Sequence, residues 1–464
     1  MARRQRTEHA DRRRRRHPAT VGAALLVAVS VLGACGSGGH TTSAATTTAV
    51  PSESAAPGAG VTATSIKIGI SLLNFSCIES FTDSIRIGEQ AVYQAFIDNI
   101  NKDGGIHGRK LVPVFEKFCP IGTATILAAC TKFTEDANVF AVIGTFYDPS
   151  GDAQTCVSGQ HHRVLVTFGL TEAIIAKAPA GLEITPDATP ERRVRILLEL
   201  LAKRHTLAGR KVAVLGDTSI ASTANSTIVP ALTKMGVQVG TTGLLSVTGT
   251  DTTAAQAQLD SFIERWKTEH VDTVFMSGNA VSSPQFVTKL RRELPNILLL
   301  SDSTEALDYA QQLERAGTKP NPYQGLLAAE GQTTQEYADS ANWKYCKDIY
   351  EETTHRHAPG PLDVIHYKGG KTLDTYGAIN DACQLLSMFH DIAQRAGKDL
   401  NNSSWIDAVN TFGHIDNRGA GPYSSLTKGK YDANDNFRLE QLDSSLPPDG
   451  NFEPITPLED VTGQ

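Results

Sequence analysis

The chain has 464 residues and a net charge of −7, with 43 Lys and Arg against 50 Asp and Glu. Residues 1–34 hold eight arginines and two acidic residues, so the remainder has 35 basic and 48 acidic residues and a net charge of −13. This acidity argues against a nucleic-acid-binding surface and against electrostatic docking on anionic lipid, because both need exposed cations.

Residues 1–34 have the pattern of an export signal. Arginines crowd the first 16 positions, and an apolar run at 21–32 follows that is shorter than the roughly 20 residues a membrane span needs. The run ends in Leu32-Gly-Ala-Cys35, which resembles a bacterial lipobox and implies cleavage before Cys35 and attachment of lipid to its sulfur. The alternative is an ordinary signal peptide with an incidental cysteine. A twin-arginine export route stays open.

Residues 35–60 are predicted to be the lipidated cysteine and a flexible tether. Positions 36–60 are almost entirely Gly, Ser, Thr, Ala and Pro, which cannot bury enough surface to fold. We therefore expect a soluble domain held at the outer face of the cell membrane.

The first folded segment, 66–116, has the order strand, helix, strand. Isoleucines alternate from Ile66 to Ile70, apolar residues then recur at helical spacing between Gly88 and Asn101, and Gly104-Gly105 stops the helix before a strand at Leu111. This order predicts a parallel sheet. Further strands are expected at Phe140 and Val164, with helices at 123–135 and 150–160.

About 400 residues after the tether are too many for one core, so two lobes are expected. A second strand and helix series follows the first. Its predicted strands are 211–216, 237–245, 273–277 and 296–300, and its predicted helices are 192–203 and 256–266. Residues 325–330 are expected to carry the chain back, and long helices at 334–352 and 373–396 to pack on the first lobe.

Six cysteines besides Cys35 predict disulfides outside the cytoplasm, and six allow 15 pairings. The first two follow neighbouring strands, the next two fall on successive helices of one face, and the last two share the late helical region. The expected pairs are Cys77–Cys119, Cys130–Cys156 and Cys346–Cys383. A metal site is the rival interpretation, but there is no CxxC spacing and no clustered histidine to complete one.

Several ordered motifs now resemble one family. Four places in the chain carry this resemblance. These are the run from Gly88-Glu-Gln-Ala-Val to Gly104-Gly-Ile-His-Gly-Arg-Lys-Leu111, the predicted strand Val139-Phe-Ala-Val-Ile-Gly144, the segment Asp374-Thr-Tyr-Gly-Ala-Ile379 and the pattern from Gly419 to Phe437. In these places the chain resembles type I periplasmic binding proteins of the leucine/isoleucine/valine-binding branch. The resemblance implies an α/β fold of two doubly wound parallel-sheet lobes joined by a hinge. The implied divisions are lobe 1 at 61–185 and 325–410, lobe 2 at 186–324, and a return to lobe 2 with a C-terminal tail at 411–464.

The family implies a solute receptor of an ABC importer that closes on a small polar ligand such as an amino acid or amide. In open parallel sheets, ligands bind at the carboxyl ends of strands. The predicted ligand contacts therefore follow strands and are Asn74, Phe75, Ser76, Phe146, Tyr147, Ser150, Phe168, Thr171, Asp217, Ser219, Asn279 and Asp302.

The resemblance also implies roles for three of these residues. Ser150 and Thr171 fall near hydroxyls that hold a ligand's carboxylate, and Asp302 best matches an acid that pairs with its amine. The family's paired serines are replaced by Tyr147-Asp-Pro-Ser150, which puts an amino-acid ligand in doubt, because Asp148 would repel an anion. For Ser150, as for Asp217, helix capping is the alternative role.

No catalytic motif marks the chain as an enzyme. Gly370-Lys-Thr372 lacks the first glycine of a phosphate-binding loop, since residue 365 is isoleucine, and neither Gly-x-Ser-x-Gly nor His-Glu-x-x-His occurs. Surface turns explain the pair His161-His162 better than metal ligation. We expect no cofactor and no metal, a monomer, and an ABC permease as partner. The alternatives are a surface lipoprotein that senses a ligand and signals to a membrane partner, and a lipoprotein that binds nothing.

Overall fold

The computed structural model describes residues 57–463 except 80, 81, 83, 149, 248–251, 316 and 447–451. The predicted signal, Cys35 and most of the tether lie outside these residues. Within the described part of the chain, no helix is both long and apolar enough to cross a membrane.

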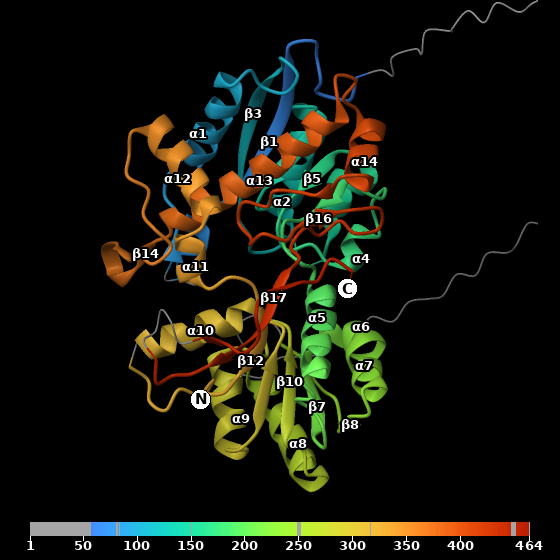
Figure 1. The fold of residues 1–464 in the computed structure, drawn as a ribbon, viewed down its shortest axis with the longest axis vertical. Helices are drawn as coiled ribbons and strands as arrows, with labels where there is room; N and C mark the ends of the chain where they lie inside the picture. The colour runs from blue at the N-terminus through green and yellow to red at the C-terminus, as the bar shows by residue number, and fades with distance from the viewer. Residues whose placement is uncertain are drawn as a thin grey trace, which may run out of the picture. The chain divides into compact units, whose positions relative to one another are not determined.

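The first lobe contains a five-stranded parallel sheet in the order β3-β1-β4-β5-β6 (Figure 1). The four predicted strands and their order along the chain are confirmed, and the fifth, β6, was not predicted. Their bounds are β1 (Ser65–Leu73), β3 (Lys110–Phe118), β4 (Ala141–Gly144), β5 (Val164–Val166) and β6 (Glu183–Ile184).

Helices cover both faces of this sheet. One core joins the sheet to α1 (Glu89–Lys102), α12 (Ala341–Thr354) and α13 (Thr375–Ala396). The other core lies under α2 (Ala124–Thr131), α3 (Asp152–Gln154) and α4 (Glu172–Ile175). Single π-helical segments at Lys132–Asp136 and Thr155–Gln160 continue α2 and α3.

The turn from α1 into β3 shows how the sequence builds this unit. Gly105 has φ +66°, and a Cβ there would lie 2.1 Å from the Arg109 carbonyl oxygen, so no other residue fits. The Asn101 side chain then accepts from the backbone N–H of Leu111 at 2.7 Å and donates to its carbonyl at 2.9 Å. These contacts lock the end of the helix to the start of the strand.

The second lobe contains a larger sheet in the order β18-β17-β12-β11-β10-β7-β8, with β9 also on β7 and β19 on β17. The strands β7, β10, β11 and β12 are parallel, and β17 is antiparallel to β12. Their bounds are β7 (Lys211–Asp217), β8 (Gln238–Val239), β9 (Gly243–Leu245), β10 (Thr273–Ser277), β11 (Leu298–Ser301), β12 (Leu327–Glu330), β17 (Asn436–Leu442), β18 (Phe452–Pro454) and β19 (Glu459–Asp460).

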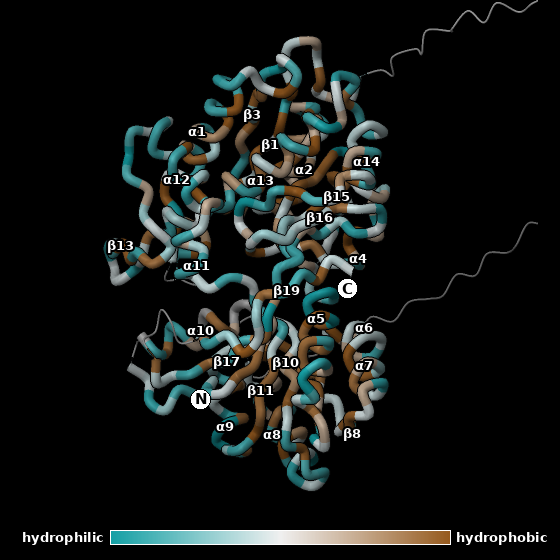
Figure 2. Tube along the Cα trace, viewed as in Figure 1, coloured by the Kyte–Doolittle hydropathy of each residue, from teal (hydrophilic) through white to brown (hydrophobic). Residues whose placement is uncertain are grey.

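Two further cores cover the faces of the second sheet. The hydropathy of the chain follows this layering, with hydrophobic segments running through the sheets (Figure 2). The helices around it are α5 (Pro190–Lys203), α6 (Ala221–Thr223), α7 (Val229–Lys234), α8 (Thr253–Glu269), α9 (Pro284–Glu293) and α10 (Thr304–Arg315).

Two predicted elements differ in the structure. The strand predicted at 237–245 is two short strands, β8 and β9, which pair with different ends of β7. The helix predicted at 334–352 is divided into α11 (Thr334–Ala338) and α12, because Ser340 caps α12 by accepting from the Trp343 N–H at 3.1 Å. The spacing of apolar residues does not reveal such a break, because it continues from one helix into the next.

The boundaries between the lobes differ from the predicted ones. The strand β12 pairs with β11, so the segment expected to carry the chain back at 325 still belongs to the second sheet. Residues 413–433 remain with the first lobe, since Ile415, Leu426 and Tyr431 are in its core, and the short strands β15 (Gly413–His414) and β16 (Ser425–Leu426) pair with each other. The chain re-enters the second sheet at β17, later than the predicted 411.

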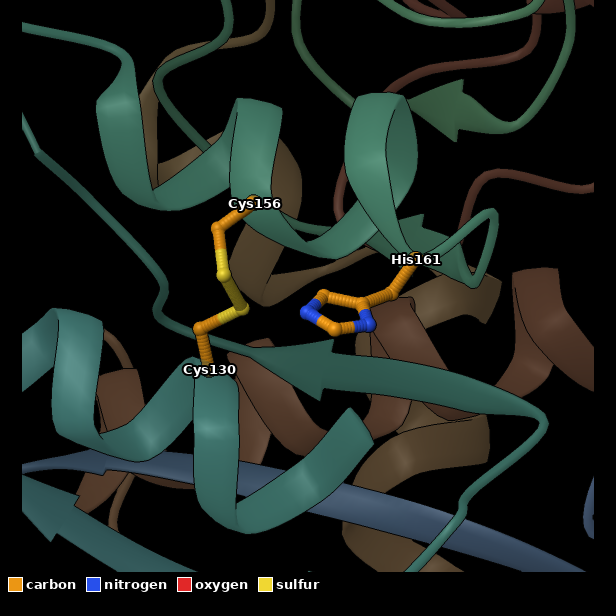
Figure 3. A group of neighbouring side chains, drawn as sticks. All are labelled: Cys130, Cys156 and His161. Carbon is orange, nitrogen blue, oxygen red and sulfur yellow. A yellow bond between two sulfur atoms is a disulfide. The ribbon is translucent and has the colours of Figure 1, made fainter. Parts of the chain in front are cut away.

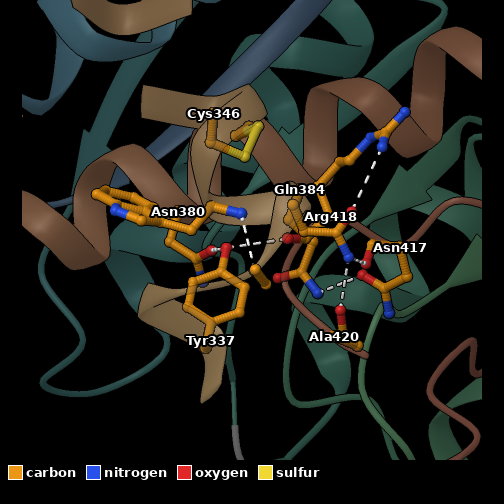
Figure 4. Close-up of a disulfide and its surroundings, with 11 residues drawn as sticks. Tyr337, Cys346, Asn380, Gln384, Asn417, Arg418 and Ala420 are labelled. Carbon is orange, nitrogen blue, oxygen red and sulfur yellow. Dashed lines mark hydrogen bonds between the residues drawn. A yellow bond between two sulfur atoms is a disulfide. The ribbon is translucent and has the colours of Figure 1, made fainter. Parts of the chain in front are cut away.

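The six cysteines form the three expected disulfides, Cys77–Cys119, Cys130–Cys156 and Cys346–Cys383. The last joins α12 to α13 beside a polar cluster (Figure 4). There Tyr337 donates to Asn380 of α13 and to the Arg418 carbonyl, and Gln384 donates to Asn417. The late helices and the returning segment near 417 are thereby joined. The next helix, α14 (Asn402–Asn410), also contacts α13.

A small three-stranded sheet was not predicted. It joins β2 (Ser84–Ile85), from the long loop after β1, to β13 (Ile365–His366) and β14 (Thr372–Leu373). Lys371 donates to the Glu79 carbonyl at 2.5 Å and to the Thr82 carbonyl at 2.8 Å. The loop that precedes α1 is therefore held by residues almost 300 positions later.

Candidate functional site

In the second lobe, the structure brings three predicted contacts together. Asp217 is the last residue of β7, and Asn279 and Asp302 follow β10 and β11. These three strands are adjacent and parallel, so their carboxyl ends lie at one sheet edge. The Asp217 carboxylate lies beside Gly278, where a Cβ would be 3.5 Å from Oδ2. The Asn279 amide oxygen accepts from the Ser303 hydroxyl at 2.6 Å.

Asp302 is the best-defined member of this edge. Its carboxylate accepts from the Ser277 hydroxyl at 2.6 Å and from the Gly278 N–H at 2.9 Å. Burial raises its pKa to about 6, against these hydrogen bonds and the charge of Arg193. Ser219 lies in the turn Thr218–Ile220 after β7, and its side chain is outside the description.

The loop after β4 corrects two expectations. Phe146 is fully buried and meets Phe118 edge to face at 6.1 Å between centroids, so it belongs to the core and not to a ligand surface. Asp148, expected to repel a ligand's anion, is also buried and accepts from Ser150 Oγ at 2.8 Å and from the Ala153 N–H at 3.1 Å. Burial alone would raise its pKa, but these hydrogen bonds lower it.

The two predicted carboxylate-binding hydroxyls make local hydrogen bonds, and one of them is a helix cap. Ser150 donates to Asp148 at the start of α3, and Thr171 caps α4 by accepting from the Ile174 N–H at 3.1 Å. Asn74 likewise accepts from the Ser76 hydroxyl at 2.6 Å and caps the turn Phe75–Cys77. Thr171 and Asn74 are therefore caps, whereas the cap position of α3 is Gly151 and Ser150 makes its hydrogen bonds within the turn before it.

Two predicted aromatic contacts are placed at the first sheet's edge. Tyr147 is 46% exposed, and its ring lies over Gly169, where a Cβ would be 2.9 Å from Cδ2. The loops after β4 and β5 therefore contact each other. Phe168 is half-buried against the first core.

Sequence reasoning missed a charged group before α1. Arg86 pairs with Asp374 at 2.8 Å, with Asp381 at 2.6 Å and with Glu89 at 3.3 Å. Burial by itself would lower the pKa of Arg86, but the three nearby acids raise it above the usual value for arginine. The small sheet brings β2 to the start of α13, which assembles this group from residues far apart in sequence. No local motif could have revealed it.

Asp187 and Arg193 were missed as well. Asp187 lies in the segment that leads from the first sheet to α5, and Arg193 is in the first turns of α5. Burial raises the pKa of Asp187 to about 6, against the charge of Arg193. The sequence offered one indication of these two residues, because both lie close to the predicted boundary between the lobes at 185–186.

Two cavities among the described residues have defined linings. The larger, about 690 Å³, is lined by α4, the start of α5, residues 427–432 and residues 462–463. The smaller, about 170 Å³, lies beside the small three-stranded sheet. Neither is lined by a predicted ligand contact, so the candidate site is defined by strand ends and charges.

One group has the residue types of a metal site. His161 points toward the disulfide between Cys130 and Cys156, and one potential ligand atom from each lies within 4.8 Å of the others (Figure 3). Both sulfurs are used in the disulfide, so neither is a thiolate that could bind a metal. His161 instead lies 3.4 Å from Glu135.

A family model described as periplasmic binding protein matches residues 80–445. No curated protein sequence matches the chain significantly.

Solved structures share the fold at low identity. A fatty acid ABC transporter substrate-binding protein from Thermomonospora curvata is 16% identical with a TM-score of 0.58, covering 88% of this chain and 95% of its own. The leucine-binding protein LivK from Thermotoga maritima is 13% identical with a TM-score of 0.57, covering 85% and 99%. A solute-binding protein of an ABC transporter from R. palustris, in complex with 4-hydroxybenzoate, is 15% identical with a TM-score of 0.57, covering 86% and 98%.

The family match spans well over half of the chain, and the sheets match the fold of these structures. The protein therefore belongs to the periplasmic binding protein family, with the type I fold of the leucine-binding branch.

Proposed function

We propose that the protein is the extracytoplasmic solute receptor of an ABC importer and captures a small polar molecule, such as an amino acid or amide, by closure of its two lobes. The observation that carries this proposal is the meeting of Asp217, Asn279 and Asp302 at the carboxyl ends of three adjacent parallel strands. Ligands of open α/β sheets bind at this edge.

The neighbouring structures support the class of function. Those described above are named as substrate-binding or solute-binding proteins of ABC transporters or as a leucine-binding protein. A receptor of this kind works outside the cytoplasm and delivers its ligand to a membrane permease. The predicted signal and lipobox at Cys35 fit that location, with the lipid holding the receptor near the permease.

Ligand binding is tested by thermal and chemical unfolding of the mature protein, residues 35–464, against amino acids, amides, short peptides and aromatic acids. A ligand at a hundred times its Kd should add about 2.7 kcal/mol to the free energy of unfolding. The D302N variant should lose most of this gain, because Asp302 lies at the proposed ligand edge.

The measurement can also contradict the proposal. If no compound stabilises the wild-type protein, and native mass spectrometry of freshly purified protein shows no bound small molecule, the protein does not act as a receptor for these solutes.

A further inference from the structure

The larger cavity lies where the two lobes join and not at the strand ends of the proposed cleft. Its lining includes Thr189, the cap of α5 after the first crossing, and Asp432, just before the last crossing. Residues 185 and 432 also form a backbone bridge there. None of the predicted ligand contacts lines this cavity. We call it the hinge cavity.

Both lobes contribute to the hinge cavity. The first lobe provides α4 and residues 427–432, and the second provides the start of α5 and residues 462–463. Two of the lining residues, Glu172 of α4 and Arg195 of α5, form an ion pair between the lobes. The volume of about 690 Å³ falls in the range of roughly 300–1,000 Å³ that is usual for small-molecule sites, which are common between domains. A molecule that fills this cavity contacts both lobes.

One wall of the hinge cavity is apolar. It is formed by the second half of α4 and the segment that follows, whose side chains here are aliphatic and carry no hydrogen-bonding group. These residues are Ile175, Ala176, Ala178 and Ala180. Contact with hydrocarbon removes such a wall from water and is favourable. A ligand with an apolar body therefore suits this wall.

The rest of the lining is rich in cations. Four basic and two acidic side chains line the cavity, an excess of two positive charges, whereas residues 35–464 together carry −13. The basic residues are Arg192, Arg195, Lys428 and Lys430, and the acidic residues are Glu172 and Asp432. The cavity therefore favours an anion on a protein that otherwise repels one.

Two of these cations are balanced by carboxylates of the protein. Asp432 lies 3.4 Å from Arg192 and accepts from the Thr189 N–H at 2.9 Å. Asp435, behind the lining, pairs with Arg192 and lies 3.1 Å from Lys430. This buried group has two cations and two carboxylates, so its role is to hold the crossing segments together.

Arg195 and Lys428 are the cations that remain for a ligand. Among the described residues, Arg195 donates only through Nη2, to Glu172, and the Lys428 ammonium makes no hydrogen bond and no ion pair. Glu191 accepts from the Glu172 N–H at 3.2 Å and does not line the cavity. Arg195 belongs to the second lobe, and Lys428 to the turn between residues 427 and 430 of the first lobe. A carboxylate in the cavity can accept charge-assisted hydrogen bonds from both lobes.

We propose that the hinge cavity binds a small organic anion with one carboxylate and an apolar body, such as a medium-chain or ring carboxylate. Lys428 and the remaining donors of Arg195 bind the carboxylate, and the apolar wall contacts the hydrocarbon. The site is separate from the cleft and independent of the ligand captured there. Because it is built from both lobes, the bound anion favours the arrangement of the lobes in which both contact it.

Isothermal titration of the mature protein, residues 35–464, tests this site with octanoate and cyclohexanecarboxylate. Acetate and inorganic phosphate lack the apolar body, and octanol lacks the charge. We expect octanoate to bind at least about 30-fold more tightly than acetate or phosphate, because they leave the apolar wall uncovered. Octanol should also bind at least about 30-fold more weakly than octanoate. R195Q and K428Q should each weaken octanoate binding at least about 10-fold.

Two matched pairs of variants locate the bound anion. K234Q removes an exposed lysine of α7 outside the lining and should keep the wild-type affinity within threefold, unlike K428Q. A176E adds a carboxylate to the cavity and should weaken octanoate binding at least about 10-fold, whereas A173E, on α4 but outside the lining, should not. The four positions are exposed, so we expect unchanged thermal unfolding of these variants without ligand.

Several results would overturn the proposal. They are octanoate bound equally well by the wild type, R195Q and K428Q, acetate or phosphate bound as tightly as octanoate, and equal losses in A176E and A173E. If neither octanoate nor cyclohexanecarboxylate binds the wild type, the cavity is not a site for this class of anion. A loss of octanoate binding in D302N, with R195Q and K428Q unchanged, would place the anion in the cleft, which supports the receptor function and contradicts this site.

Discussion

At the residue scale, several side chains predicted to contact a ligand make local hydrogen bonds within the protein. Ser150, Thr171 and Asn74 lie where ligand contacts were expected, and each satisfies backbone or side-chain groups at the start of a helix or turn. The same short polar side chains suit both roles. Only the three-dimensional structure shows that these oxygens already have partners within the protein.

Glu183 is a buried charge that the proposed function does not use. It lies in β6 and is 1% exposed, and neither carboxylate oxygen has a hydrogen-bond partner within the described residues. Burial raises its pKa to about 7, and Ser158 and Lys177 offset this only in part. Since the folded-state pKa exceeds the unfolded value of 4.5, its stabilising contribution is complete below pH 4.5 and is lost as the pH rises through 7.

We predict that E183Q removes part of this pH dependence. Near pH 8 the variant should be more stable than wild type by up to about 3 kcal/mol, and near pH 5 the difference should be small. Denaturant unfolding at both pH values measures this, with the exposed E453Q as control. A wild-type pH slope in E183Q would contradict the assignment. Some slope will remain, because burial also raises the pKa of Glu440 to about 7.

At the element scale, one arginine ties α5 to the returning chain. Arg192 is 3% exposed and pairs with Asp432 and Asp435, and it donates to the carbonyls of Asn434 at 2.8 Å and Val461 at 3.0 Å. Asp432 also accepts from the Thr189 N–H at 2.9 Å, at the cap of α5. Segments near 190, 433 and 461 are thus joined by one buried network.

We predict that R192Q lowers the free energy of unfolding by about 3–5 kcal/mol, because it removes the arginine that pairs with two buried carboxylates and leaves both to Lys430. The neighbouring R195Q removes an exposed ion pair and should cost no more than about 1 kcal/mol. Chemical unfolding of the two variants, followed by circular dichroism, compares them. Equal small losses would show that Lys430, which lies 3.1 Å from Asp435, is sufficient to neutralise the network.

At the scale of the whole molecule, two doubly wound sheets place their strand ends where loops from distant sequence converge. The cell location of this molecule depends on the segment before the fold. We predict that C35A releases the protein from the membrane fraction while leaving its thermal unfolding unchanged, because the anchor would be a lipid on that sulfur. Fractionation of cells that express both forms measures this. If C35A stays with the membranes, the lipobox interpretation is wrong.

The sequence alone determined the strand and helix order of both lobes. Apolar alternation, helical periodicity and glycine stops are local properties, so Ile66–Ile70, the helix after Gly88 and the strand at Lys211 could be recognised without a structure. It also predicted that Asp217, Asn279 and Asp302 would meet, because parallel strands share one carboxyl edge.

Only the tertiary structure decided which side chains remain available to a ligand. Phe146 lies in the core, Ser150 donates to the Asp148 carboxylate, and the Thr171 oxygen accepts from the Ile174 N–H at the start of α4. The place of Arg193 became visible because residues of β12 and β17, more than 130 positions away, contact its guanidinium. Partner choice across such distances depends on packing and burial, which no local pattern of residues encodes.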